Sequence, residues 1–243
     1  MTLNNLDSRT VTTHFGTERY LNLGAWGVGA AEVATLAPAL VDRLHPKTLL
    51  LATNLMDFTG SNILKAADSA AVVGDLDASS GWRNYLRHWN GPYYLRQIEL
   101  NKVRSSDRAN YEYFGLDAHG AATLEVPADR IDRRRFDQAP TKAAQLTAER
   151  YAAFERLARD MHARQVRMVV LQCAYRDGLR DPELNSTQAM HVRRLRELAE
   201  PFGHVVVDGN EASWSDALYV DASHLGPEGA ARFTAYALGR VSH

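Results

Sequence analysis

Residues 146–172 read LTAERYAAFERLARDMHARQVRMVVLQ, a helix-like stretch followed directly by a short apolar run. Apolar side chains recur every three or four residues as far as Met161, which predicts an amphipathic helix. The run that follows, Arg167 to Gln172, has the length and the β-branched content of a buried strand. A helix that leads into a buried strand is the repeating unit of an α/β fold with a parallel sheet.

The same alternation extends along the rest of the chain. Further helical patterns run from Val33 to Leu44, where His45-Pro46 ends the helix, and from Val192 to Leu198. A last helix is expected to begin at Pro227, because proline is favoured at the first helical position. The other strand candidates are Thr2–Leu6, Arg19–Leu23, Thr48–Thr53 and His204–Val207, and the second and third of these would form a βαβ unit with the helix between them.

Length and charge limit the possible functions. The 243 residues predict one α/β domain, with an insertion at about 76–140 that breaks the alternation and is rich in Trp and Tyr. This insertion is either a lid over a site or a helical excursion packed on the side of the domain. Lys and Arg number 28 against 29 for Asp and Glu, so no overall field attracts nucleic acid or an anionic membrane. The cluster Arg133–Arg135 lies among aspartates, which predicts a solvated surface of mixed charge.

Cofactors and membrane spans are not expected. The histidines lack the spacing of a metal site, and Gly24, Gly27 and Gly29 do not match a dinucleotide-binding loop. Cys173, the one cysteine, is expected to be a core residue at the end of a strand. No apolar stretch approaches the roughly 20 residues that cross a bilayer, and residues 1–9 do not form a signal peptide. If Met1 is the natural start the protein is expected in the cytoplasm, and if the chain is trimmed an extracytoplasmic location is open.

Two loop segments carry candidate catalytic residues. Asp221 and His224 are three residues apart, just before the last predicted helix, so that the carboxylate can hold one nitrogen of the imidazole. Ser8 follows the first strand candidate and would lie at the same edge of the sheet. A serine, a histidine and an aspartate in this arrangement suit nucleophilic acyl transfer.

Four blocks of the sequence together resemble the SGNH (GDSL-type) hydrolases. In order, they are Leu6-Asp7-Ser8, Tyr20 to Gly27, Leu51-Ala52-Thr53-Asn54 and Asp221 to Leu225. The pair Ser8-Arg9 and the ending Asp-x-x-His-Leu-x-Pro-x-Gly at 221–229 are most similar to the branch of alginate O-acetyltransferase-like and D-alanyl-transfer proteins. The resemblance implies a three-layer, flavodoxin-like sandwich with a central parallel sheet.

The resemblance also implies a role for each matching residue. Ser8 is the expected nucleophile, His224 the general base and Asp221 the residue that orients it. The amide of Gly24 and the side chain of Asn54 are expected in the oxyanion hole, together with the amide of Ser8 itself. The implied activity is that of a serine esterase or O-acyltransferase acting on the acyl ester of a hydroxylated compound, such as a cell-envelope glycan, without a metal or cofactor.

Two further expectations concern the substrate and an alternative function. Arg9 and Arg176, near the predicted strand ends, could steer an anionic acceptor. Leu6 replaces the glycine that the family has before Asp-Ser, and of the third block only Asn54 is kept. Because of these departures an alternative function stays open, in which the protein is a catalytically inactive member of the same fold that binds a glycan or a protein partner. Whether water or a sugar hydroxyl ends the reaction, and the oligomeric state, are also open at the level of sequence.

Overall fold

A parallel sheet of three strands forms the centre of the protein. The computed structural model describes residues 5–24, 28–60, 114–124, 126, 131, 133–137 and 139–241. The strands of this central sheet are β1 (Thr48–Thr53), β4 (Arg167–Gln172) and β5 (Val205–Asp208), in the order β1-β4-β5. All three strands are parallel, and their register pairs Thr53 with Gln172 and Gln172 with Asp208. Their carboxyl ends therefore meet at one edge of the sheet.

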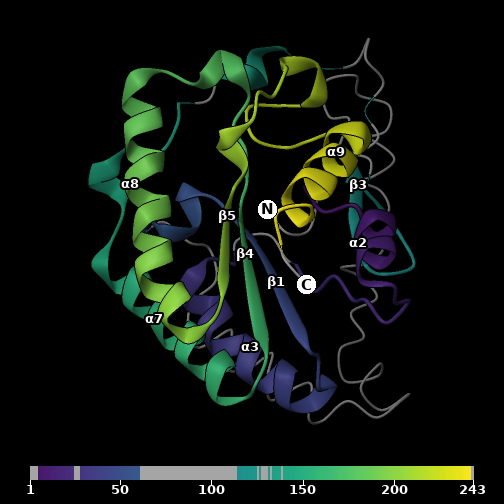
Figure 1. Cartoon of the computed structure of the whole chain (residues 1–243). Helices are drawn as coiled ribbons and strands as arrows, with labels where there is room; N and C mark the ends of the chain where they lie inside the picture. Colours follow the sequence, from purple (N-terminus) through teal and green to yellow (C-terminus); the bar gives the residue numbers. More distant parts are fainter. Residues whose placement is uncertain are drawn as a thin grey trace, which may run out of the picture.

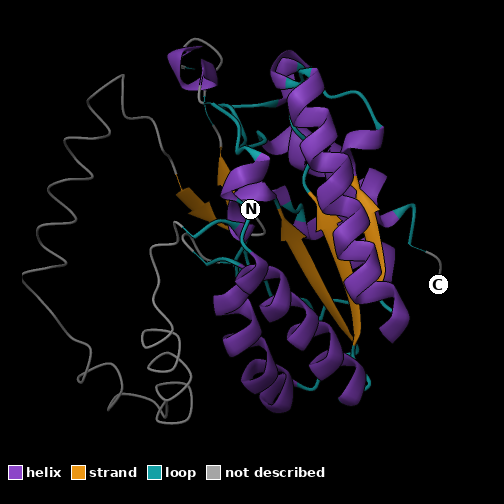
Figure 2. Ribbon diagram, turned by 90° about the vertical axis from the view of Figure 1, so that its left-hand side faces the viewer, coloured by secondary structure: helices purple, strands orange, loops and turns teal. Residues whose placement is uncertain are grey.

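Helices cover both faces of this sheet (Figure 1). One face carries α3 (Ala30–Leu44), α7 (Ala148–Ala163) and α8 (Pro182–Ala199), and the other carries α2 (Ser8–Phe15) and α9 (Pro227–Leu238). A separate antiparallel hairpin, β2 (Phe114–Leu116) with β3 (Ala122–Leu124), lies apart from the sheet (Figure 2). Short 3-10 helices make many of the connections: η1 (Leu55–Phe58), η3 (Arg133–Asp137), η4 (Ala143–Gln145), η5 (Asp177–Leu179), η6 (Glu200–Phe202), η7 (Gly209–Glu211) and η8 (Asp216–Leu218).

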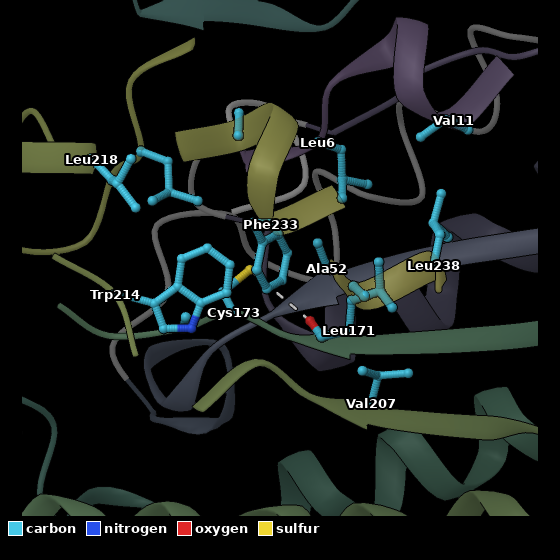
Figure 3. Close-up of a cluster of buried hydrophobic side chains, with 14 of the residues drawn as sticks. Leu6, Val11, Ala52, Leu171, Cys173, Val207, Trp214, Leu218, Phe233 and Leu238 are labelled. Carbon is cyan, nitrogen blue, oxygen red and sulfur yellow. Dashed lines mark hydrogen bonds between the residues drawn. The ribbon is translucent and has the colours of Figure 1, made fainter. Parts of the chain in front are cut away.

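The alternation of side chains along β4 divides the core into two clusters. Met168 and Val170 are buried against α3, α7 and α8, whereas Val169 and Leu171 are buried on the side of α9. In the second cluster Trp214 meets Phe233 of α9 edge to face (Figure 3). The Nε1–H of Trp214 donates to the Gly209 carbonyl at 2.6 Å. Both faces of the strand are apolar because both are covered by helices.

The sequence prediction is confirmed for most of the frame. Thr48–Thr53 and Arg167–Gln172 are strands with the predicted bounds, and the strand expected from His204 begins at Val205. The helix after residue 30 ends at His45, whose left-handed backbone (φ 47°) closes it before Pro46. The last helix begins at Pro227. Cys173 is buried directly after β4, and burial raises the pKa of its thiol to about 12.

The prediction of a strand over Arg19–Leu23 is wrong. These residues have no regular structure; Leu21 and Leu23 are 58% and 55% exposed. Between these two leucines, Asn22 is buried. Its backbone N–H donates to the His119 carbonyl at 2.7 Å and not to a neighbouring strand. A short apolar run satisfies a strand pattern, but it becomes a strand only where a partner strand lies beside it. The βαβ unit expected between Arg19 and Thr53 is therefore absent.

The other strand candidate, Thr2–Leu6, is not seen in the described residues. Residues 2–4 lie outside them, and neither Asn5 nor Leu6 belongs to a strand. Most of the insertion expected at about 76–140, including Trp82 and Trp89, also lies outside the described residues. Its described part contains the β2–β3 hairpin and η3.

A buried histidine joins α8 to α7. The side chain of His191 is fully buried, its Nδ1 lies 2.6 Å from the Tyr151 hydroxyl, and its ring packs edge to face on Phe58. Burial lowers the pKa of His191 to about 3, because the imidazolium would lose its hydration. The unfolded chain therefore binds a proton that the folded chain does not bind, over the interval from about pH 6.5 down to about pH 3. The folded state loses stability as the pH falls through that interval.

We expect His191 to account for about 2 kcal/mol of the stability that the protein loses between pH 7 and pH 5. Urea unfolding at both pH values should show that His191→Gln loses less stability than the wild type by that amount. His162→Gln, at an exposed position of α7, is the matched control and should behave as the wild type. An equal loss in His191→Gln and the wild type would contradict the assignment.

Candidate active site

The loop between η8 and α9 holds Asp221 and His224 in contact. His224 Nδ1 lies 2.9 Å from Oδ2 and 3.0 Å from Oδ1 of Asp221. The backbone amides of Ser223 and His224 donate to Oδ1 of the same carboxylate at 2.9 and 2.8 Å. Burial opposes ionisation of Asp221, but the hydrogen bond and charge of His224 and these two amides outweigh it and lower the pKa of the carboxyl.

This contact fixes the tautomer of the neutral imidazole. An ionised carboxylate can only accept, so Nδ1 of His224 carries the proton and Nε2 keeps its lone pair. The side chain of His224 is 32% exposed, whereas that of Asp221 is 11% exposed. The pair therefore has the form of a general base oriented by a buried carboxylate.

Backbone contacts hold the loop at the carboxyl edge of the sheet. The Tyr219 hydroxyl donates to the carbonyl of Ala174, two residues beyond β4, at 3.0 Å. The Val220 amide donates to the His224 carbonyl at 2.9 Å, and the Gly226 amide donates to the Leu218 carbonyl at 2.9 Å. The loop is thus a closed turn, which the contact between Val220 and His224 closes at its base.

Ser8 lies at the first residue of α2, one position after the N-cap. The carboxylate of Asp7 caps the helix by accepting from the Thr10 amide at 2.7 Å. The Asp7 amide donates to Thr234 Oγ1 of α9 at 2.9 Å, and the Leu225 amide donates to Asn5 Oδ1 at 3.2 Å. Residues 5–8 are therefore tethered both to α9 and to the residue that follows His224.

The Ser8 side chain is 3% exposed, and its hydroxyl makes no hydrogen bond of ordinary geometry to the described residues. The structure thus brings the segments that carry Ser8 and His224 together, but it does not join the two side chains by a hydrogen bond.

The β2–β3 turn contributes Asp117, which the sequence did not single out. Asp117 Oδ1 accepts from the amides of His119 and Ala121 at 2.8 and 3.0 Å. Burial of Asp117 opposes its ionisation, but the nearby Ser8 hydroxyl and these amides lower the pKa of its carboxyl. Nothing in the local sequence distinguishes Asp117 from an ordinary turn residue, because its contact with Ser8 spans more than 100 positions.

The two expected oxyanion-hole residues are both engaged in local contacts. The amide of Gly24 donates to Asn22 Oδ1 at 2.9 Å, so an oxyanion at this point would have to displace Asn22. Asn54 follows β1, and its Oδ1 caps η1 by accepting from Met56 and Asp57 at 2.8 and 3.3 Å. The amide group of its side chain is therefore oriented, with the carbonyl end used and the NH₂ end left as the donor.

The two arginines expected to bind substrate differ in their surroundings. Arg9 is exposed on the first turn of α2. Arg176 is 8% exposed; its Nη1 donates to Asp216 at 2.9 Å, its Nη2 donates to the Phe136 carbonyl at 2.6 Å, and its guanidinium stacks on the Phe136 ring. Through these contacts Arg176 connects the segment that follows β4 to η3.

A third arginine, Arg135, reaches the site from η3. Its Nη2 lies 3.6 Å from Asp221 Oδ2, and its carbonyl accepts from the Ala222 amide at 3.1 Å. The cluster Arg133–Arg135 is thus a solvated surface at Arg133 and Arg134, as the sequence predicts, but not at Arg135. The physical reason is that the Phe136 side chain of η3 is buried in the core, and this places the neighbouring Arg135 beside the Asp221 loop.

Comparisons with known proteins leave the family open. No protein-family model, no curated protein and no solved structure matches the chain. Among the residues that the structure describes, no group of His, Cys, Asp and Glu side chains could hold a metal ion, and no helix is long and apolar enough to cross a membrane. The geometry of the site is therefore the basis of the functional argument.

Gly229, in the first turn of α9, fixes how closely the helix approaches the loop. A Cβ at this position would lie 2.4 Å from the Leu218 carbonyl oxygen and 2.9 Å from Leu225 Cδ2. We expect Gly229→Ala to displace the loop and to cost about 1–3 kcal/mol of unfolding free energy in urea titrations. Gly226→Ala is the matched control, since a Cβ there meets its nearest atom at 3.6 Å. Equal stability of the two variants would show that the close approach is not a constraint.

Proposed function

We propose that the protein is an SGNH-like serine esterase or O-acyltransferase that forms an acyl intermediate on Ser8. The observation that carries the proposal is the Asp221–His224 contact of 2.9 Å at the entrance to α9, with the segment of Ser8 tethered beside it. A histidine oriented by a carboxylate next to a helix-terminal serine is the arrangement that acyl transfer requires. The sequence resemblance of the four blocks points to the same chemistry.

In the proposed reaction His224 Nε2 takes the proton of Ser8 as Oγ attacks the acyl carbonyl carbon. The carbonyl π electrons move to oxygen, and the intermediate collapses as the C–O bond to the alcohol breaks and His224 returns the proton to that alcohol. Water or a second hydroxyl, deprotonated by His224, then attacks acyl-Ser8, and the Ser8 C–O bond breaks as Oγ recovers its proton. Asp221 stabilises the imidazolium that forms twice in this cycle.

Stabilisation of the oxyanion would come from the amino end of α2 and from Asn54. The amide of Ser8 lies in the first turn of that helix, where the backbone dipoles favour negative charge. The NH₂ end of Asn54 is the donor left after its carbonyl end caps η1. The Gly24 amide could join them only after its hydrogen bond with Asn22 opens.

The finer fold is part of the same proposal. A three-layer, flavodoxin-like arrangement of the SGNH type accounts for helices on both faces of the parallel strands and for a candidate site at their carboxyl edge. The substrate class, an acyl ester of a carbohydrate or cell-envelope glycan, rests on the resemblance. The Trp and Tyr residues of the insertion, whose ring faces would suit stacking on sugar rings, fall in 76–113, outside the described residues.

A second candidate function is a binding module without catalysis. The observations that favour it are the Ser8 hydroxyl, which makes no hydrogen bond to His224, and the Gly24 amide, which is occupied by Asn22. In that case the same fold would bind a glycan or a protein partner without turnover.

Labelling with a fluorophosphonate and hydrolysis of p-nitrophenyl acetate distinguish the two functions. The wild type should be labelled and active, and Ser8→Ala and His224→Gln should each lose at least about 100-fold of the activity, because nucleophile and base act as a unit. Ser186→Ala, on the exposed side of α8, is the matched control and should stay active. A folded wild type that is neither labelled nor active would overturn the proposed chemistry and favour the binding module.

A further inference from the structure

Helix α9 is the element that the two halves of the candidate site share. The loop of Asp221 and His224 leads into its first residue, Pro227. Helix α2, whose first residue is Ser8, packs against α9 (Figure 1). No hydrogen bond among the described residues joins the side chains of Ser8 and His224. The distance between nucleophile and base therefore depends on how each segment is attached to α9.

Thr234, two turns into α9, makes the attachment that lies next to the nucleophile in sequence. Its side chain is fully buried. The Asp7 amide donates to Thr234 Oγ1 at 2.9 Å, and the Thr234 hydroxyl donates to the Ala230 carbonyl at 2.8 Å. A hydroxyl has one proton, so the bond to Ala230 uses it and leaves a lone pair of the oxygen for the Asp7 amide. The orientation of this acceptor is thus fixed within α9 itself.

Asp7 passes this constraint on to Ser8. Its amide is held by Thr234, and its carboxylate caps α2 by accepting from the Thr10 amide at 2.7 Å. The backbone and the side chain of the N-cap residue are therefore both fixed, one on α9 and the other on the first turn of α2. Ser8 is the next residue and is itself 3% exposed. A displacement of Asp7 would carry Ser8 with it.

The packing of α9 holds Thr234 and the loop of the candidate base in one frame. Phe233, the residue before Thr234, is fully buried, and its ring meets Trp214 edge to face. At the other end of the helix a Cβ on Gly229 would lie 2.4 Å from the Leu218 carbonyl oxygen, so α9 fits closely against the segment that leads into the loop. The helix is thus anchored at both of the places to which the site is attached.

We propose that Thr234 is a positioning residue of Ser8. By accepting from the Asp7 amide, its hydroxyl oxygen sets the position of the first turn of α2, and with it the position of the Ser8 hydroxyl relative to His224. The inference rests on the proposed function, because this position matters for catalysis only if Ser8 is the nucleophile. A misplacement of about 1 Å that arises away from the chemistry can lower a rate by about 100-fold.

Two pairs of side chains at position 234 test this role, since the members of each pair differ in the hydroxyl. Thr234→Val keeps the β-branched shape of the wild type and removes the acceptor, and Thr234→Ala removes it relative to Thr234→Ser. We expect Thr234→Val to lower kcat for p-nitrophenyl acetate, and the rate of fluorophosphonate labelling, about 10- to 100-fold with KM unchanged within about twofold. Thr234→Ser should keep at least about a third of the wild-type kcat, and Thr234→Ala should lose activity as Thr234→Val does.

Amide hydrogen exchange reports on the contact without reference to activity. In Thr234→Val the Asp7 amide should exchange at least about 10-fold faster than in the wild type, because its acceptor is gone, and Thr234→Ser should restore its protection. Thr187→Val is the matched control, since it changes a buried threonine of α8 on the opposite face of the sheet. This variant should leave both kcat and the exchange of Asp7 as in the wild type.

The outcomes distinguish this inference from the proposed function. A folded Thr234→Val protein with the wild-type kcat, or with unchanged exchange at Asp7, would overturn the role of Thr234 and leave the chemistry of Ser8 intact. An equal loss of activity in Thr234→Ser and Thr234→Val would assign the effect to packing and would also overturn it. If Thr234→Val did not fold, the comparison of Thr234→Ala with Thr234→Ser would decide. A wild type that is not labelled at Ser8 would refute the proposed function, and this role with it, before any variant is compared.

Discussion

The parallel pairing of β1, β4 and β5 is the constraint on which the rest of the structure depends. Because the three strands run in the same direction, their carboxyl ends meet at one edge, and α7 and α8, the helices that lead into β4 and β5, both pack on one face of the sheet. The segment that follows β5 contains the loop of Asp221 and His224, which Tyr219 ties to the carbonyl of Ala174 beyond β4. The candidate site is therefore at this edge for a topological reason before any of its side chains is considered.

The charge balance of the site follows from burial at that edge. Asp221 is removed from water, and it stays ionised because two backbone amides and one imidazole N–H donate to it. A buried carboxylate with these donors is held in one orientation, which suits a role in positioning the ring of His224. The guanidinium of Arg135, from another part of the chain, lies 3.6 Å from the same carboxylate. The geometry of the pair therefore depends on burial and on these contacts together.

The sequence predicted the parts of the fold that local patterns determine. β1, β4 and the start of α9 were found because apolar runs, a helix period and Pro227 act over a few residues, and the Asp221–His224 contact was found because it spans three positions. The strand over Arg19–Leu23 failed because pairing requires a neighbour that the pattern cannot supply. Asp117 and Arg135 were missed for the same reason, since their contacts with Ser8 and Asp221 join segments far apart in sequence.

The two halves of the candidate site come from opposite ends of the described chain. Asp7 bonds to Thr234 and Asn5 bonds to Leu225, and each contact closes a loop of more than 200 residues. The entropic cost of closing a loop grows only slowly with the length of the loop. Two hydrogen bonds and the packing of α2 on α9 can therefore hold the two ends of the chain together once the sheet has formed. The Ser8 segment has no strand to anchor it among the described residues, and its position relative to His224 depends on these contacts. The placement of the nucleophile is therefore a property of the α2–α9 packing, whereas the orientation of the base is a property of one closed turn.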